Sequence, residues 1–349
     1  MAPTYSFVIA TYQRPAMLLR CLSLAVSQTR LPKQVIVIDA SPDWESTRQQ
    51  AQAAFQAIGT SVPLVYNQAE RASSAFQRNQ GAAHCSANVV VFIDDDSLLF
   101  ADCAEEFMRP FDLDTDHCVA GVGMILVMDV PDMPVGSAER GEDLGARKRG
   151  FRGFVRRLLG AENIFVPYDY DFPKHSVPNW IDRTAFGVRA TLTGNRMAVR
   201  TSIVLKEPFE QLLERYASGE DSDMSYRASR HGLLLTAFRA RVCHMQAPGG
   251  RLSQCAVTAL GCTNPMALHR VYGQDQDRSR TESYRLLRRR LIIELTKDLC
   301  NGSVSFPRTR GVLIALKAAR TIFGKSVDEL RLWYPQFQHT LIRSYRSAN

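Results

Sequence analysis

Apolar runs and helix-spaced apolar residues alternate through the first hundred residues. A run that is apolar at every position is typical of a strand in a sheet covered on both faces, and most such sheets are parallel. We expect strands at 6–10, 35–38, 63–66 and 89–93, and helices at about 16–28, 45–58 and 74–87. This order predicts an α/β fold with a mostly parallel sheet, whose ligands bind at the carboxyl ends of the strands.

The pattern is less regular beyond residue 102. A further strand is expected at 119–127, and two segments at 193–200 and 233–242 bracket a helix. From residue 251 the chain is expected to be mainly helical, with loops at 273–277 and 301–307. We therefore expect a domain over 1–250 and a helical C-terminal extension over 251–349.

Composition narrows the class of protein. With 45% hydrophobic and 22% charged residues, the 349-residue chain is a packed globule and not a disordered protein. No apolar stretch is long enough to span a membrane, and the first strand lacks the basic start of a secretion signal. We expect a cytoplasmic protein. The eight cysteines form no C-x-x-C pair, which favours reduced thiols over a zinc site.

Positive charge is concentrated in two places. Residues 251–349 include 17 Lys and Arg but only 7 Asp and Glu, while the whole chain has a net charge of +8. A basic insert at 147–160 interleaves six cations with apolar residues. The insert, and the tail with it, either lies on an anionic membrane surface or, for the insert, forms a loop whose arginines are solvated or bind phosphates. The segment 284–299 is similar, and such a segment more often packs on its own domain. Nucleic acid is not an expected partner, because the cations do not alternate with stacking aromatics.

Three successive acids follow the strand at 89–93. Asp94, Asp95 and Asp96 repel one another at the end of a buried strand unless a cation shares the site. Carboxylates suit Mg²⁺ or Mn²⁺, and these ions usually bridge protein carboxylates to substrate phosphates. The alternative is that the acids cap the next helix. We favour a metal and phosphate site.

A second acidic pair and a histidine come later in the chain. Glu220 and Asp221 stand where the period becomes helical, and a carboxylate there could take a proton from an attacking hydroxyl. Alternatively, the pair caps the helix with Arg227 as partner. His244 ends a strand-like run, where it is either a metal ligand or a core residue.

Taken in order, these motifs resemble those of the family 2 glycosyltransferases. Residues 7–15 (FVIATYQRP) resemble the family's opening strand and T-Y-N-R-P loop, and 35–41 (VIVIDAS) its second strand, which ends in D-x-S. Residues 75–81 (AFQRNQG) resemble the A-x-x-R-N-x-G helix, which is followed by the acid cluster. Residues 194–200 (GNRMAVR) and 219–227 (GEDSDMSYR) resemble the G-N-x-x-x-x-R and G-E-D-x-D-x-x-x-R motifs. The chain departs from the pattern at Ala10 and Ile38, which leaves the identity of the nucleotide base open.

The resemblance implies the GT-A fold, a Rossmann-like and mostly parallel sheet flanked by helices, here with a mainly helical, basic C-terminal region. It also implies that the domain has a nucleotide-binding half over about 1–118 and an acceptor half over about 119–250. Site residues follow from the same resemblance. The nucleotide-sugar would contact Thr11, Tyr12, Arg14, Asp39, Arg78, Asp94 and Asp95. The metal would be held by Asp96 and His244, and the acceptor side would include Gly194, Asn195 and Glu220. Asp221 would be the catalytic base.

The function implied is inverting transfer of a sugar from a nucleotide-diphosphate donor, with UDP-sugars favoured, to a saccharide or lipid-linked acceptor. Mn²⁺ or Mg²⁺ would be the cofactor, and the setting would be assembly of bacterial-type surface polysaccharide or glycolipid, with the protein peripheral at the inner face of the membrane. The alternative is an inactive GT-A platform that binds membranes or anionic polymers. Nucleotidyl transfer is disfavoured, because residues 11–15 form no glycine-rich basic phosphate loop.

Overall fold

A computed structural model describes residues 2–134, 141, 167, 168, 170–214, 219–246 and 252–345. The chain divides into two compact units. The sheet unit consists of Met1–Leu144, Phe172–Phe209 and Met224–Gly250. The helical unit consists of Gly145–Asp171, Glu210–Asp223 and Arg251–Asn349. The basic insert predicted at 147–160 lies outside the described residues, and the domain boundary predicted at 250 stays a prediction.

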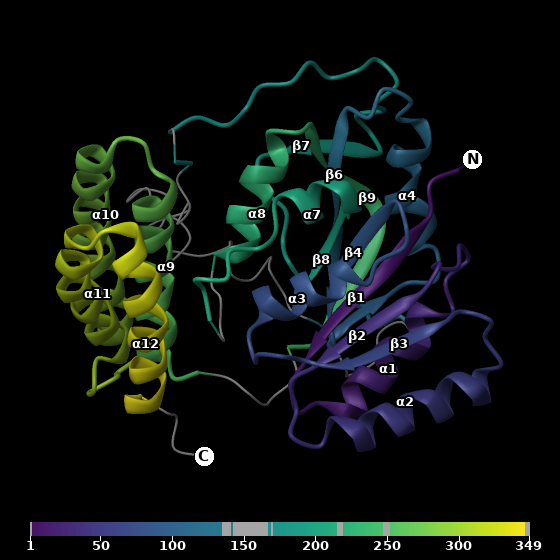
Figure 1. Ribbon diagram of the computed structural model, residues 1–349, viewed down its shortest axis with the longest axis horizontal. Coiled ribbons are helices and arrows are strands. Elements are labelled where there is room, and N and C mark those ends of the chain that lie inside the picture. The colour runs from purple at the N-terminus through teal and green to yellow at the C-terminus, as the bar shows by residue number, and fades with distance from the viewer. Residues whose placement is uncertain are drawn as a thin grey trace. The chain divides into compact units, whose positions relative to one another are not determined.

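A nine-stranded mixed sheet forms the centre of the sheet unit (Figure 1). Its strands are β1 (Tyr5–Thr11), β2 (Val35–Asp39), β3 (Leu64–Gln68), β4 (Val89–Asp94), β5 (Ser97–Leu99), β6 (Val119–Val127), β7 (Phe186–Arg189), β8 (Arg196–Arg200) and β9 (Leu233–His244). They follow the order β3-β2-β1-β4-β8-β6-β9-β5, and β7 also pairs with β9. The first four are parallel, as predicted, whereas β8 runs antiparallel to both β4 and β6. The expected α/β fold is confirmed, with an antiparallel part that the sequence pattern did not predict.

Helices pack on both faces of the sheet. They are α1 (Pro15–Ala25), α2 (Trp44–Ile58), α3 (Ser74–Ala83) and α4 (Cys103–Leu113). Two further helices are α7 (Thr201–Lys206) and α8 (Glu220–Ser229), and the first four residues of α8 group with the helical unit. Residues of α1 and α4 share a core with Tyr5, Phe7 and Ile9 of β1. On the opposite face, α3 comes so close to β1 that a Cβ at Gly81 would lie 2.3 Å from Val8 Cγ1. Both faces of the parallel strands are therefore buried, which explains their unbroken apolar runs.

Some elements differ from the sequence-based expectation. The helix expected to reach residue 87 ends at Ala83, because the amides of His84 and Cys85 bond to carbonyls only three residues back and close the last turn. The elements β5, β7, α4 and α7 were not predicted. β5 has three residues, too few for a period to show, and α4 carries Pro110 in its interior.

Four helices form the described C-terminal part of the helical unit. They are α9 (Gln254–Tyr272), α10 (Gln276–Cys300), α11 (Pro307–Gly324) and α12 (Val327–Ser344), which confirms the expected helical C-terminal region. Gly311 lets α11 approach α9, because a Cβ there would lie 2.6 Å from the Cys255 carbonyl oxygen. The buried Tyr334 hydroxyl of α12 bonds to Thr263 and Asn264 of α9. Within the described ranges, no helix has both the length and the hydrophobicity that crossing a membrane requires.

A buried ion pair connects three elements of the sheet unit. Asp114, which ends α4, accepts hydrogen bonds from the amides of Cys118 and Val119 at 2.9 and 2.8 Å and from Arg200 Nη2 of β8 at 2.7 Å. Its side chain is 0% exposed. Burial alone would raise the pKa of Asp114, but these hydrogen bonds together hold it below its usual value. The carboxylate therefore stabilises the fold in its charged form.

We expect Asp114→Ala to lower the free energy of unfolding by about 3–5 kcal/mol at neutral pH, because it leaves Arg200 with its partner removed. Since the pKa of Asp114 is depressed in the folded state, the wild-type advantage is present above the unfolded pKa of about 3.9 and is lost as the pH falls further. Urea unfolding at neutral and acid pH measures both effects. The control is Asp112→Ala, which breaks an exposed pair with Arg30 and should cost about 1 kcal/mol or less. Equal losses for the two variants would contradict this account.

Candidate active site

The carboxyl ends of three parallel strands meet at one edge of the sheet. In the register of these strands Thr11 lies beside Asp39, and Ala10 lies beside Asp94. The polar residues that follow β1, β2 and β4 therefore come together, as the sequence predicted for the ends of parallel strands.

The loop after β1 is held by polar contacts from neighbouring elements. Gln13 has a left-handed backbone with φ 55°, and its amide donates to Ser41 Oγ at 2.7 Å. The buried Gln77 of α3 donates to the carbonyl oxygens of Thr11 and Ile38 at 3.0 and 2.8 Å. These carbonyls lie where β1 and β2 end, so Gln77 fixes the gap between the two strands. Neither Ser41 nor Gln77 was predicted as a site residue.

Asp39 is buried and hydrogen-bonded within the protein. It is 1% exposed, and its carboxylate accepts from the Tyr66 hydroxyl at 2.6 Å and from the Ser41 amide at 2.8 Å. Burial, together with the hydrogen bond to Asp39, raises the pKa of Tyr66 above its usual value. Each carboxylate oxygen can accept a second bond, so contact with a base edge stays a prediction for Asp39. Tyr12, predicted to lie near the base, is 39% exposed.

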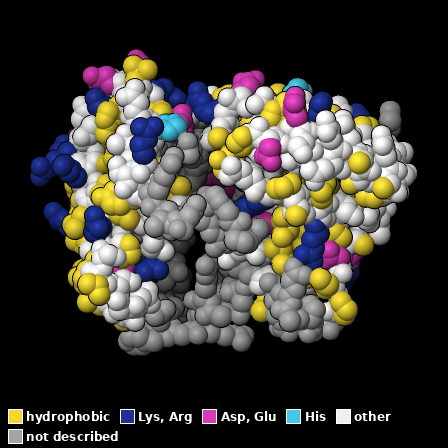
Figure 2. All heavy atoms as spheres, turned by 90° about the horizontal axis from the view of Figure 1, so that it is seen from below, with side chains coloured by type: hydrophobic (Ala, Val, Ile, Leu, Met, Phe, Trp, Pro, Cys, Tyr) yellow, Lys and Arg dark blue, Asp and Glu magenta, His cyan; other side chains and the backbone are white. Residues whose placement is uncertain are grey.

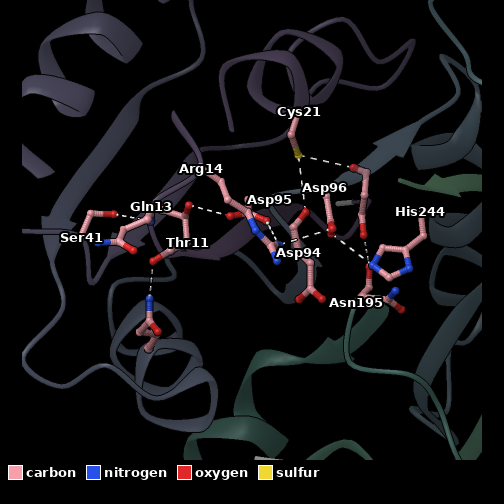
Figure 3. A network of polar contacts seen from close by, with 12 residues as sticks. Thr11, Gln13, Arg14, Cys21, Ser41, Asp94, Asp95, Asp96, Asn195 and His244 are labelled. Atoms are coloured by element: carbon pink, nitrogen blue, oxygen red, sulfur yellow. Dashed lines mark hydrogen bonds and ion pairs between the residues drawn. The ribbon is translucent and has the colours of Figure 1, made fainter. Parts of the chain in front are cut away.

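Two arginines form ion pairs with the acid cluster. Arg14 Nη1 lies 3.0 Å from Asp95 Oδ1 and 3.4 Å from Asp96 Oδ2, and Arg78 Nη2 lies 2.9 Å from Asp94 Oδ1. Thr11 Oγ1 donates to Asp95 at 2.7 Å. Figure 3 shows Thr11, at the end of β1, and Arg14, in the loop that follows, turned toward the acids. The structure therefore brings together five of the seven residues predicted to contact the nucleotide-sugar.

The pKa of Asp95 reflects its burial in this cluster of charges. Burial raises its pKa to about 7, Arg14 and Thr11 oppose the rise, and repulsion from Asp96 and Asp94 adds to it. Arg14 and Thr11 thus do not fully offset the burial of Asp95 beside two other carboxylates. A divalent cation at the cluster would favour the ionised forms of all three.

The donor set fits a divalent metal ion. Single ligand atoms from Asp94, Asp96 and His244 all lie within 4.8 Å of one another. Pairing of β5 with β9 sets Ser97 opposite His244, and His244 Nε2 lies 3.1 Å from Asp96 Oδ1. Carboxylates suit Mg²⁺ and Mn²⁺ alike, whereas an imidazole favours the softer Mn²⁺. Asp94, expected only at the nucleotide, thereby becomes a third candidate ligand beside the two predicted ones.

The loop before β8 contributes part of the predicted acceptor side. A Cβ at Gly194 would lie 3.0 Å from Arg78 Nη1, so the glycine lets this loop approach the guanidinium group. Ser97 Oγ donates to the Asn195 carbonyl oxygen at 3.0 Å. Phe209 packs against the same arginine, with the guanidinium carbon 5.6 Å from the ring centre. Gly194 and Asn195 thus lie beside the acid cluster, and Phe209 was missed because no local pattern links it to residue 78.

Glu220 and Asp221 lie in the first turn of α8. The division between the two units falls inside this helix, after Asp223, so both acids group with the helical unit. The Ser222 amide donates to Asp221 Oδ1 at 2.8 Å. The catalytic role of Asp221 and the acceptor role of Glu220 stay predictions.

We expect Asp96→Asn to weaken Mn²⁺ binding by at least about tenfold, because removing a direct ligand costs more than removing an outer partner. Titration calorimetry with Mn²⁺, with and without UDP, measures the loss. Asp102→Asn is the control, since Asp102 is an exposed acid paired with Arg241 and lies outside the donor set. Unchanged Mn²⁺ affinity in the Asp96 variant would remove this residue from the metal site.

Part of the chain matches a known protein family. Residues 6–164 match the family model described as glycosyl transferase family 2. A comparison with curated proteins gives no match.

Solved structures of glycosyltransferases are similar in fold. GalNAc-T7 with UDP, GalNAc and Mn²⁺ has a TM-score of 0.55 at 15% identity, covering 99% of this chain and 58% of that one. The mannosyltransferase PcManGT from Pyrobaculum calidifontis, in complex with GDP-Man and Mn²⁺, has a TM-score of 0.50 at 14% identity, covering 98% and 86%. S. aureus TarS 1-349 has a TM-score of 0.50 at 14% identity, covering 98% and 89%. The resemblance of this chain to the family 2 glycosyltransferases, and the GT-A fold that it implied, are thereby confirmed.

Proposed function

We propose that the protein is an inverting, metal-dependent glycosyltransferase that moves a sugar from a nucleotide-diphosphate donor to an acceptor hydroxyl. The observation that carries the proposal is the cluster of Asp94, Asp96 and His244 at the ends of parallel strands, flanked by two arginines. Such a set can hold a divalent cation and the diphosphate that the cation accompanies. The similar structures of GalNAc-T7 and PcManGT each contain Mn²⁺, the first with UDP and the second with GDP-Man.

Binding of the donor would redistribute the charges of the cluster. Arg14 and Arg78 are paired with carboxylates, and their guanidinium groups can bind diphosphate oxygens as bidentate donors. When bound, Mn²⁺ or Mg²⁺ would neutralise the charge that develops on the leaving diphosphate. Arg78, held by Asp94 and packed on Phe209, would supply the positive charge that the protein itself directs at the diphosphate.

Transfer itself needs a base for the acceptor. Asp221 would accept the hydroxyl proton as the acceptor oxygen bonds to the anomeric carbon and the bond from that carbon to the diphosphate oxygen breaks. Attack from the face opposite the leaving group inverts the anomeric centre. The products are the glycosylated acceptor and a nucleoside diphosphate, with a UDP-sugar as the favoured donor.

The acceptor is proposed to be a saccharide or a lipid-linked saccharide in the assembly of bacterial-type surface polysaccharide or glycolipid. The basic balance of residues 251–349 supports a setting near an anionic surface. Measuring turnover by the wild type and by a variant of the proposed base distinguishes a transferase from a binding platform without activity.

We expect Asp221→Asn to lower kcat by about 100- to 10,000-fold, because general base catalysis contributes that much. A thermal-shift screen with Mn²⁺ first identifies the nucleoside diphosphate that raises the melting temperature most, and sugars linked to that nucleotide then serve as donors. Release of the nucleoside diphosphate measures turnover. The affinity for the nucleoside diphosphate should not change, and Asp116→Asn, at an exposed acid, should retain full activity. Normal turnover by the Asp221 variant would exclude it as the base. No turnover by the wild type with any donor would favour the binding platform.

A stripe on α10 supports contact with an anionic membrane. We define the α10 stripe as residues that share one face of the helix by their heptad spacing, namely Arg285, Arg288, Ile292, Leu295 and Leu299. The three apolar members are 39–60% exposed, and both arginines are exposed as well. On the helical unit in Figure 2, basic and hydrophobic side chains lie beside one another at the surface. Arginines followed by exposed aliphatic residues suit an anionic lipid surface, where the cations meet headgroups and the aliphatic side chains enter the interface.

We expect Ile292→Gln, Leu295→Gln and Leu299→Gln together to weaken binding to phosphatidylglycerol vesicles by at least about tenfold, because apolar area no longer enters the interface. Co-sedimentation with vesicles measures binding. The control carries Leu205→Gln and Leu332→Gln, two exposed leucines outside the stripe. Equal binding of all three proteins, or binding to phosphatidylcholine as strong as to phosphatidylglycerol, would count against the membrane contact.

A further inference from the structure

A polar cluster in the helical unit surrounds the turn that carries Asp221. We propose that the helical unit is a working part of the transferase, and that Tyr168 and Asp223 position the first turn of α8. The inference rests on the proposed role of Asp221 as the base. It adds positioning residues to that role and gives the C-terminal helices a function in the reaction.

Asp223 is the first element of this cluster. It lies two residues after Asp221, is 0% exposed, and accepts a hydrogen bond from the Tyr168 hydroxyl. Its amide donates to the Gly219 carbonyl oxygen at 3.0 Å, which closes the turn around Asp221. Burial of a carboxylate is costly unless hydrogen bonds satisfy it. The bond from Tyr168 therefore fixes where this turn can lie.

Tyr168 is itself fixed by α9. Its ring centre lies 5.3 Å from that of His269 in an edge-on arrangement and 5.2 Å from that of Tyr272. His269 Nδ1 lies 3.3 Å from Ser279 Oγ of α10, which holds the imidazole in turn. The position of the Tyr168 hydroxyl thus depends on the packing of the C-terminal helices.

A second set of contacts holds the segment 210–214 ahead of α8. Glu210 is 5% exposed and accepts from the Tyr272 hydroxyl and from Arg331 Nη1 of α12, the latter at 3.1 Å. Gln338 of α12 donates to the Leu212 carbonyl oxygen at 2.8 Å and accepts from the Glu214 amide at 3.1 Å. Tyr272 belongs to both sets, because its ring packs on Tyr168 while its hydroxyl reaches Glu210. The helices α9 and α12 therefore attach to the chain before the turn, and α9 also attaches to the turn through Tyr168.

These contacts have two interpretations that an experiment can separate. If they only stabilise the helical unit, losing any one of them lowers stability and leaves the chemistry alone. If they position the base, loss of the Tyr168 hydroxyl lowers kcat without a matching loss of donor binding. The chain offers a matched control in Tyr170, whose hydroxyl donates to Ser279 of α10 at 3.1 Å, so that its loss leaves the bond between Tyr168 and Asp223 in place.

The test compares Tyr168→Phe with Tyr170→Phe in the full chain. Both variants keep an aromatic ring and lose one hydroxyl. We expect Tyr168→Phe to lower kcat for release of the nucleoside diphosphate by up to about 100-fold, with the donor KM unchanged, and Tyr170→Phe to resemble the wild type. Amide hydrogen exchange supplies a readout that needs no turnover. Exchange of the amides at 221–223 should become about tenfold faster or more in Tyr168→Phe and remain unchanged in Tyr170→Phe.

Each outcome decides either the positioning role of Tyr168 or the proposed transferase function. An active wild type with an equally active Tyr168→Phe variant overturns the positioning role, as does unchanged exchange at 221–223. If the two substitutions have equal effects on kcat and on exchange, both hydroxyls serve only the stability of the helical unit. This result would also overturn the positioning role of Tyr168. A wild type that releases no diphosphate from any donor contradicts the proposed function, and the exchange measurement still decides whether Tyr168 positions the turn.

Discussion

Repulsion among three adjacent carboxylates is the constraint on which the site depends. A buried strand delivers Asp94, Asp95 and Asp96 in succession to one edge of the sheet, where water cannot fully screen them. The fold therefore has to bring cations to the same place, and it does so with Arg14 from the loop after β1 and Arg78 from α3. The same repulsion that costs stability in the free protein makes the edge attractive to a divalent cation and the diphosphate bound to it. Stability and ligand binding are two consequences of one charge imbalance.

The parallel part of the sheet makes this concentration of charge feasible. Parallel strands end at a common edge, so residues that are far apart in the sequence meet there without long loops. The polar side chains of Gln77 and Ser41 then fill the hydrogen-bonding needs that remain where the strands separate. The antiparallel pairing of β5 with β9 adds His244 to the same edge, because it sets this residue opposite Ser97, next to the last acid.

The sequence predicted those parts of the site that local pattern encodes. The apolar run that ends in three acids predicts both a buried strand and a charged edge of the sheet. The order of further motifs allowed Arg14, Arg78 and His244 to be predicted as site residues. Tyr66 and Phe209 could not be found this way, because they meet Asp39 and Arg78 only through the tertiary fold. The same holds for Tyr168, whose partner Asp223 is 55 residues away and belongs to no shared period. The strands β5 and β7 escaped prediction for a related reason, since such short strands are selected by pairing and carry too few residues for a pattern.

The contacts around α8 are polar, and this bears on how precisely they could hold the proposed base Asp221. Apolar packing tolerates small shifts with little change in energy, whereas a buried carboxylate such as Asp223 loses much of its stabilisation when its donor moves away. A polar contact therefore defines the position of the first turn of α8 more narrowly than an apolar one of the same area. General base catalysis has the same requirement, because proton transfer from an acceptor hydroxyl demands hydrogen-bond geometry. Anchoring the turn through Tyr168 and Asp223 puts the narrowest constraint where the proposed reaction tolerates the least displacement.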